Sequence, residues 1–150
     1  MDMMKKKLML LICALALLLV LGGCNSNQQE LKDGYYSAEM KNYRNGWKEF
    51  VTIRVSEGEI VSVEYNAKNA SGFIKSWDMR YMRNMSARTG TYPNRYTRSY
   101  AAFFLEAQTP DFADTVTGAS ISNKSFRAMC EALLEKARAG DTTLAIVDVE

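Results

Sequence analysis

The residues best suited to chemistry in this 150-residue chain stand together at Asp114–Ser122, in the sequence D-T-V-T-G-A-S-I-S. An apolar pattern with a period near four follows as far as about Ala139, which predicts a helix beginning here. The first N–H groups of a helix lack partners and favour anions, so a phosphate could be held beside the hydroxyl of Ser120. Because Asp, Thr and Ser are also the usual capping residues, a capped helix without a ligand is the alternative.

The inventory of histidine and cysteine limits the chemistry further. The chain has no histidine, and its three cysteines are Cys13, Cys24 and Cys130. Haem attachment, imidazole metal sites and histidine-activated nucleophiles are therefore excluded, and no metal site is predicted. Cys130 falls on the apolar face of the predicted helix, where a buried, inert thiol is expected rather than a redox centre. Redox chemistry would need a bound cofactor.

The first 23 residues have the pattern of a secretory signal: three lysines within Met1–Lys7, an apolar run at Leu8–Leu21, and small residues before Cys24. A membrane-spanning helix is the alternative, but the run is shorter than the roughly 20 residues that a bilayer requires. The ending L-G-G-C resembles the lipobox of bacterial lipoproteins. That resemblance implies cleavage before Cys24 and its modification with palmitate-type acyl chains, which would anchor the protein at the extracytoplasmic face of the cell membrane.

Charge gives no reason to expect a nucleic-acid partner. Without residues 1–23 the chain has 127 residues with sixteen basic and sixteen acidic side chains, so its net charge is about zero. Residues 24–32 are polar and predict a tether, and residues 33–150 have the length of one domain. The stretch from Lys75 to Arg98 contains six basic residues and a single acidic residue, Asp78. Solvated helix faces explain this imbalance, and a phosphate-steering patch is the alternative.

Three short stretches at the start of the domain predict an antiparallel β-meander. Tyr35–Met40 is extended, and apolar and polar residues alternate in Lys48–Val55 and Ile60–Tyr65. The connections, Asn42–Gly46 and Ser56–Glu59, are short and contain glycine, as hairpin turns do. We therefore expect a single α+β domain in which three to five strands pack with helices.

Three helices are predicted in the rest of the chain. The first is capped by Ser76 and ends near Arg88, the second begins at Pro93, and the third follows the hydroxyl-rich segment and stops at Gly140. Thr142–Val149 is β-branched and predicts a last strand. Met79, Met82 and Met85 could suggest a soft-metal site, but packing or the lining of a pocket for a flat ligand is simpler. The expected apolar stripes are Trp77, Tyr81, Met82 and Met85; Tyr96, Tyr100, Phe103, Phe104 and Ala107; and Phe126, Met129, Cys130, Leu133, Leu134 and Ala137.

The order of residues in D-T-V-T-G-A-S-I-S resembles the flavinylation motif of the FMN-binding domain family, in which an aspartate precedes Ser/Thr-Gly-Ala-Thr/Ser and another hydroxyl residue. The resemblance extends over roughly Asp33–Gly140, and Gly46-Trp47 through Asp78 is most like small bacterial lipoproteins described as membrane-anchored immunogens. Ser120 stands where the family more often has threonine, and Thr115 where glycine or alanine is commoner. Both differences leave the hydroxyl chemistry available.

The resemblance implies that Ser120 takes FMN through a phosphoester bond, transferred from FAD by a separate Mg²⁺-dependent flavin transferase. The recognition motif would be Asp114, Thr117, Gly118 and Ala119, with Ser122 as the following hydroxyl residue. A phosphate esterified to Ser120 would lie near the helix N-terminus, which favours its charge. The flavin ring needs a flat apolar slot, for which the candidates are Trp47, Trp77, Tyr81 and Met82.

These observations favour an FMN-carrying lipoprotein that transfers electrons between quinone- or NADH-linked membrane proteins and external acceptors, rather than a stand-alone enzyme. A binding or structural surface lipoprotein that keeps the fold without flavin is an alternative from another class. A carrier that holds flavin noncovalently is a third.

Overall fold

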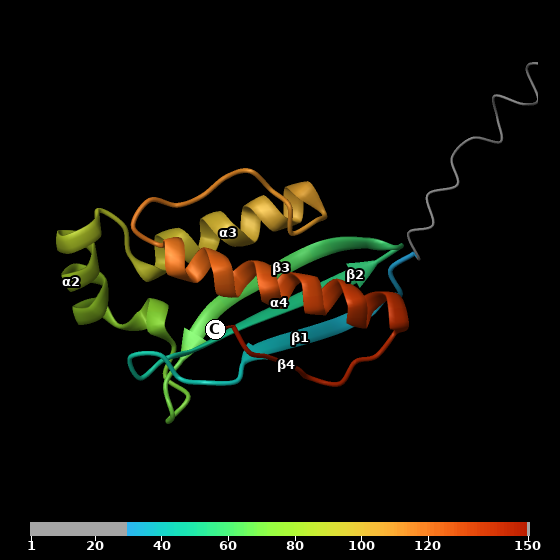
Figure 1. Ribbon diagram of the computed structural model, residues 1–150, viewed down its shortest axis with the longest axis horizontal. Helices are drawn as coiled ribbons and strands as arrows, with labels where there is room; N and C mark the ends of the chain where they lie inside the picture. Colours follow the sequence, from blue (N-terminus) through green and yellow to red (C-terminus); the bar gives the residue numbers. More distant parts are fainter. Residues whose placement is uncertain (1–29, 150) are drawn as a thin grey trace, which may run out of the picture.

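A four-stranded sheet carries helices α3 and α4 on one face, and helix α2 lies beyond one end of it (Figure 1). The computed structural model describes residues 30–149, so the predicted signal peptide, Cys24 and most of the tether lie outside the described residues. The predicted α+β domain with three helices is confirmed. The elements are β1 (Gly34–Met40), β2 (Lys48–Ser56), β3 (Glu59–Lys68), the short 3₁₀ helix η1 (Lys75–Trp77), α2 (Met79–Thr89), α3 (Pro93–Ala107), α4 (Ser120–Ala139) and β4 (Ala145–Val147).

Strands β1, β2 and β3 form the predicted antiparallel meander, and β4 joins the other edge of β1 in parallel. Ala38 of β1 is opposite Ala145 of β4. Because α4 runs back to the end of the sheet where β1 begins, the returning chain must run in the same direction as β1. The β-branched composition of the last strand predicted its existence but not this orientation.

The turn between β2 and β3 is held by two residues with positive φ, Glu57 at 56° and Gly58 at 77°. Two such residues give the tight hairpin turn whose twist matches that of the strands. Gly58 adopts this conformation without the steric cost of a β-carbon. The predicted hairpin is confirmed, and β3 runs on to Lys68, three residues beyond the predicted end.

At the start of the edge strand β3, a side chain forms hydrogen bonds with the strand's backbone. Gln108 follows α3 directly, with a φ of 57°. Its Oε1 accepts from the N–H of Ile60 at 2.8 Å, and its Nε2 donates to the carbonyl oxygen of Ile60 at 3.0 Å. The amide of Gln108 thus satisfies both backbone groups of Ile60, as a neighbouring strand would.

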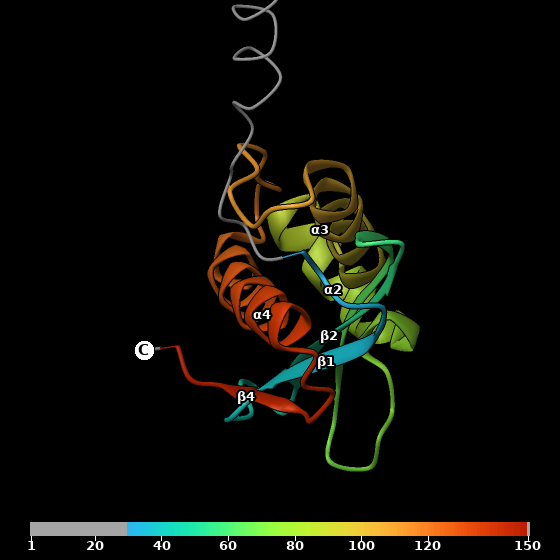
Figure 2. The same ribbon diagram turned by 90° about the vertical axis from the view of Figure 1, so that its right-hand side faces the viewer.

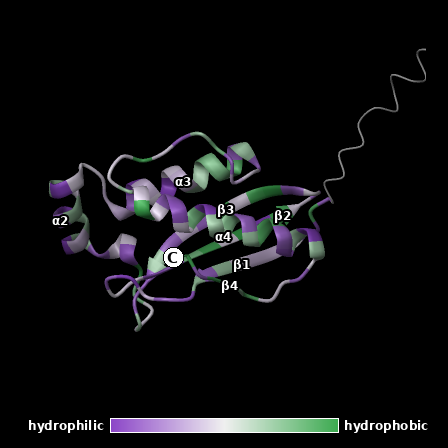
Figure 3. Cartoon of the chain, in the orientation of Figure 1, coloured by the Kyte–Doolittle hydropathy of each residue, from purple (hydrophilic) through white to green (hydrophobic). Residues whose placement is uncertain are grey.

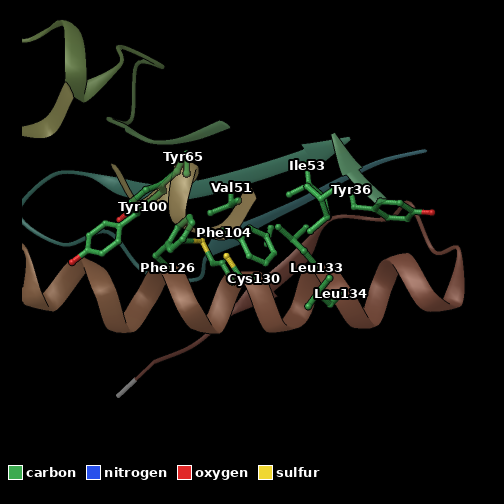
Figure 4. Packing of buried hydrophobic residues seen from close by; sticks show 14 of the residues in the cluster. Tyr36, Val51, Ile53, Tyr65, Tyr100, Phe104, Phe126, Cys130, Leu133 and Leu134 are labelled. Atoms are coloured by element: carbon green, nitrogen blue, oxygen red, sulfur yellow. The ribbon is translucent and has the colours of Figure 1, made fainter. Parts of the chain in front are cut away.

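The hydrophobic core lies between the sheet and the pair α3 and α4, which run side by side over one face (Figures 2 and 4). Phe126 of α4 stacks on Tyr100 of α3, with ring centroids 5.7 Å apart and an angle of 27° between the planes. The predicted stripes of α3 and α4 face this core. Cys130 is fully buried within it, and burial raises the pKa of its thiol well above 9, as expected of an inert cysteine.

Helix α2 differs from its prediction at its start. Asp78, rather than Ser76, is the N-cap, and its carboxylate accepts from the N–H of Tyr81 at 2.9 Å. The hydroxyl of Ser76 instead accepts from Asn66 Nδ2 at 2.8 Å, because residues 75–77 form the separate helix η1. The predicted cap at Ser76 is wrong because the sequence pattern did not reveal this break.

The chain enters the domain at one end of the molecule, and the hydroxyl-rich segment lies at the other end. At one end, the tether pole, the N–H of Lys32 donates to Ala137 O at 3.0 Å and its ammonium to Ala139 O at 3.1 Å. At the other end, the site pole, α4 begins at Ser120 close to α2 (Figure 1). A 20-residue helix is about 30 Å long, so the chain enters the domain about 30 Å from Ser120. Within residues 30–149 no helix has both the length and the apolar character needed to span a membrane.

Candidate functional site

The connection 108–119 carries the hydroxyl-rich segment back along α3 to the start of α4 (Figure 1). Arg127 of α4 holds its first half, because its guanidinium donates to the carbonyl oxygens of Pro110 and Phe112. The same guanidinium lies 4.1 Å from the centroid of the Phe112 ring. Its Nε donates to Asn123 Oδ1 at 2.8 Å. A long connection is thereby fixed by one side chain of the helix that follows it.

Tyr100 fixes the second half of the connection. Its buried hydroxyl accepts from the N–H of Val116 at 3.1 Å and donates to the carbonyl oxygen of Ala119 at 3.3 Å. The two contacts bracket the Thr117-Gly118 turn that precedes α4. Ser120 is therefore positioned by a hydroxyl group at the centre of the core.

The small residues of the segment are explained by packing. Gly118 has a φ of +82° and lies against Thr89 at the end of α2, and Ala119 is 4% exposed. A β-carbon at Gly118 would collide with Thr89, and Ala119 is a small side chain in a buried position. Gly118 is thus required by this chain's own fold, whether or not a modifying enzyme also needs access there.

The N-terminus of α4 has no side-chain cap. Ala119 is the N-cap residue, and none of the segment's side-chain oxygens accepts from the first turn as a cap would. Asp114 and Thr117 are exposed and outside the pocket described next. The alternative of a helix capped by these hydroxyl and carboxylate groups is therefore wrong, and the dipole of α4 remains available to an anion.

A pocket of about 320 Å³ opens at this helix terminus. It brings together five residues of the segment Asp114–Ser122, four of them predicted site residues, and two of the four predicted slot residues, Trp47 and Tyr81. The rings of Trp47 and Tyr81 meet edge to face, with centroids 5.9 Å apart. Trp77 and Met82 do not line it, and Trp77 is 67% exposed. The lining residues are Arg44, Asn45, Trp47, Glu49, Lys75, Tyr81, Met85, Tyr96, Gly118, Ala119, Ser120, Ile121 and Ser122.

Ser120 lies between this pocket and a second one. The second pocket, of about 350 Å³, shares Arg44, Ser120 and Ile121 with the first and adds Lys124 and Val149. Ser120 is exposed, and within residues 30–149 its hydroxyl has no hydrogen-bond partner. A group attached to this oxygen could therefore extend into either pocket.

Lys75 supplies a buried cation to the first pocket. It is 9% exposed, and its Nζ lies 4.6 Å from the ring centroid of Tyr81. Burial lowers the pKa of Lys75, but its interactions with the hydroxyls of Tyr96 and Tyr81 outweigh burial, so the pKa is raised above 10.5. The ammonium is consequently charged at neutral pH and available to an anionic ligand.

Glu49 binds the first turns of α4 to the sheet. Its carboxylate accepts from the hydroxyls of Ser122 and Tyr65, each at 2.8 Å, and from that of Ser125. Burial raises the pKa of Tyr65 well above 10, and the Glu49 carboxylate beside it adds to the rise. The two serines of the motif region therefore differ, because Ser122 is bonded to a carboxylate and Ser120 is not.

Several pocket residues were not predicted from the sequence. Glu49 could have been found, because it has the same parity in β2 as the inward-facing Val51 and is thus a carboxylate at a core position. Tyr96 was assigned only to the core. Arg44 reaches the pocket through tertiary placement, for which no spacing in the sequence is a signal. Lys75 was noted in the sequence only within the alternative of a phosphate-steering patch, and Met85 only within the alternative of a pocket lining; both line this pocket.

No protein-family model matches the chain. The chain is 37% identical over 129 residues to the 15 kDa lipoprotein of Treponema pallidum strain Nichols, covering 85% of this chain and 90% of that protein. The crystal structure of the CPE2226 protein of Clostridium perfringens superposes with a TM-score of 0.76 at 33% identity, covering 80% of this chain and 99% of the other. A solution structure of a Clostridium thermocellum protein covers 71% of this chain and 92% of its own at 29% identity, with a TM-score of 0.49. The 37% identity to the Treponema pallidum protein, over most of both chains, shows that this chain belongs to the family of the 15 kDa lipoprotein.

Proposed function

We propose that this lipoprotein carries FMN on Ser120 through a phosphoester bond and transfers electrons at the extracytoplasmic face of the cell membrane. The observation that carries the proposal is the exposed, unbonded hydroxyl of Ser120 at the rim of two pockets, within a segment that resembles a flavinylation motif. Bound FMN would supply the redox chemistry, and the chain would supply its position and electrostatic surroundings.

The groups around Ser120 suit a phosphate diester. The α4 N-terminus lacks a side-chain cap, so its N–H groups and dipole favour negative charge. Arg44 and Lys75 line the same pocket and would partly neutralise the phosphate. Esterification would proceed as the transferase cleaves the pyrophosphate of FAD, joins the FMN phosphate to Ser120 Oγ and releases AMP.

The aromatic walls suit a flat ring. Trp47 and Tyr81 provide apolar surface at right angles to each other, and Met85 adds an adaptable thioether. Met85 takes the part expected of Met82, which does not line the pocket. At about 320 Å³ the pocket is at the lower end of the usual range for ligand sites, so part of the bound group would extend toward the second pocket.

The choice of Ser120 over Ser122 follows from hydrogen bonding. A hydroxyl that already donates to a carboxylate and is half-buried is a poor substrate for a large transferase, and Ser122 is in that position. Ser120, exposed and unbonded, can be reached. The role of Ser122 would be to fix the first turn of α4 through Glu49.

The location of the site fits a tethered carrier. Lipidation of Cys24 would hold the tether pole near the membrane, and the pocket would open about 30 Å from where the chain enters the domain. From this position the pocket could meet both quinone- or NADH-linked membrane donors and external acceptors.

Intact-mass analysis of protein co-expressed with a flavin transferase tests the proposal. Wild type should gain the mass of FMN less one water, Ser120→Ala should gain nothing, and Ser122→Ala should still be modified. Equal modification of wild type and Ser120→Ala would overturn the attachment site. A yellow colour that is lost on denaturation and desalting would indicate a noncovalent carrier. A protein that stays colourless after incubation with FMN would indicate a binding or structural lipoprotein.

A further inference from the structure

Helix α2 has basic side chains that nothing else in the described chain pairs with. Arg80 and Arg83 are exposed, and neither forms an ion pair within residues 30–149. They are three residues apart and thus share one face of the helix, away from Tyr81 and Met85, which line the pocket. Figure 3 shows α2 in mostly hydrophilic colours. No residue of α2 is buried, although a helix of 11 residues is marginal without packing.

The tether pole has the opposite character. A groove of about 960 Å³ there is lined by five exposed acidic residues and one basic residue, Arg138. Glu131 and Glu135 are four residues apart on one face of α4. None of the five acids forms an ion pair within residues 30–149. The acidic residues of this groove, the acidic groove, are Glu30, Glu59, Asp111, Glu131 and Glu135.

We propose that α2 of one copy docks into the acidic groove of a second copy of this chain. Arg80 and Arg83 would meet Glu131 and Glu135, because residues three and four apart on a helix have similar spacing along its axis. Trp77, the last residue of η1, is 67% exposed, and Met79, the first residue of α2, is 61% exposed; both would be covered by the second copy. The occupant is a second copy because the two surfaces are complementary in charge and each is unpaired within the chain.

The contact joins different surfaces at opposite ends of the molecule. Such a head-to-tail contact does not close on itself as a two-fold dimer does, and it therefore builds open rows. Exposed ion pairs are individually weak and screened by salt, so the contact is weak in solution. Anchoring through Cys24 would confine the copies to one surface and raise their effective concentration, which favours rows along the membrane.

Energy transfer between labelled copies of the lipidated chain that begins at Cys24, in phosphatidylcholine vesicles, tests the proposal. Donor and acceptor dyes are attached to separate preparations of Ser71→Cys, an exposed position, since the buried Cys130 does not compete for the label. Transfer should be high at about 0.02 M salt and fall severalfold at about 0.5 M, where the screening length is only a few Å.

Charge reversal identifies the surfaces. R80E/R83E and E131K/E135K should each reduce transfer to the high-salt level, and the fourfold variant with both changes should restore it with the signs exchanged and the net charge unchanged. R54E reverses an exposed charge on the uncovered face of β2 and should leave transfer unaltered, whereas the single R83E lowers it. The proposal is overturned if wild type shows no salt-sensitive transfer. A fourfold variant that folds, as judged by circular dichroism, but does not recover transfer also overturns it.

Discussion

A β-carbon added at Gly118 would lie 2.8 Å from both the Cβ and the carbonyl oxygen of Thr89. The turn before α4 thus packs directly against the end of α2. This contact holds together the two elements that line the candidate site on either side. The carbonyl oxygen belongs to the backbone, so it cannot move aside as a flexible side chain would.

Gly118→Ala should lower the free energy of unfolding by about 2–4 kcal/mol, because it combines a collision with a left-handed conformation. Gly72→Ala is a matched control, since Gly72 has a φ of +84° but no atom within 4 Å of an added β-carbon. Its cost should be about 1 kcal/mol. Urea unfolding followed by tryptophan fluorescence measures both, and equal costs would contradict the collision.

Tyr100→Phe should destabilise the protein by about 1–3 kcal/mol, since it leaves Val116 N–H and Ala119 O without their partner. Hydrogen exchange at the Val116 amide should accelerate more than exchange in β2. Tyr35→Phe, at a position 65% exposed, is the control and should change stability by less than about 0.5 kcal/mol. An unchanged Val116 exchange rate in Tyr100→Phe would count against the role given to this hydroxyl.

Glu39 gives the protein a pH-dependent stability. Burial raises the pKa of this carboxyl, but hydrogen bonds and charge from Lys68 and Lys48 outweigh burial, so the pKa is lowered from 4.5. A lowered folded-state pKa contributes stability that is present above about pH 4.5 and is lost as the pH falls through the folded-state value. Glu39→Gln should therefore cost about 1 kcal/mol at pH 7 and much less at pH 3. Urea unfolding at the two pH values tests this, and a cost that does not depend on pH would refute it.

Cys130 should react with thiol reagents only when the protein unfolds. Its side chain is fully buried and burial raises its pKa well above 9, so little thiolate exists and none is accessible. Labelling at pH 8 should proceed at a rate that rises with urea in parallel with unfolding. Rapid, stoichiometric labelling of the native protein would show that this part of the core opens.

Local pattern was sufficient for most of the fold. The alternation in Lys48–Val55 and the glycine turn at Gly58 predict the hairpin. The alternation depends directly on which side chains of the strand are buried, and the glycine depends directly on the backbone conformation of the turn. The same holds for the stripe of α4, whose residues touch the sheet at a regular spacing. The cap of α2 was misplaced because η1 and α2 meet at Asp78, and a break between two short helices leaves no trace in apolar spacing.

The site was predicted only in part, for a physical reason. Ser120 and its neighbours are contiguous in the chain, so a motif can reveal them. Arg44 and Lys75 come from a turn and a short helix that are remote in sequence and meet only in the folded chain. Trp77 was a candidate for the flat apolar slot, but it precedes the break at Asp78 and is 67% exposed.

The side-chain amide of Gln108 affects how readily the edge strand β3 can pair with another chain. An edge strand with free N–H and C=O groups is a template on which another chain can pair and aggregate. On β3 the first such pair, at Ile60, is already occupied by a side chain that cannot propagate a ladder. Gln108 thus acts as a one-residue barrier against intermolecular sheet growth at the start of β3.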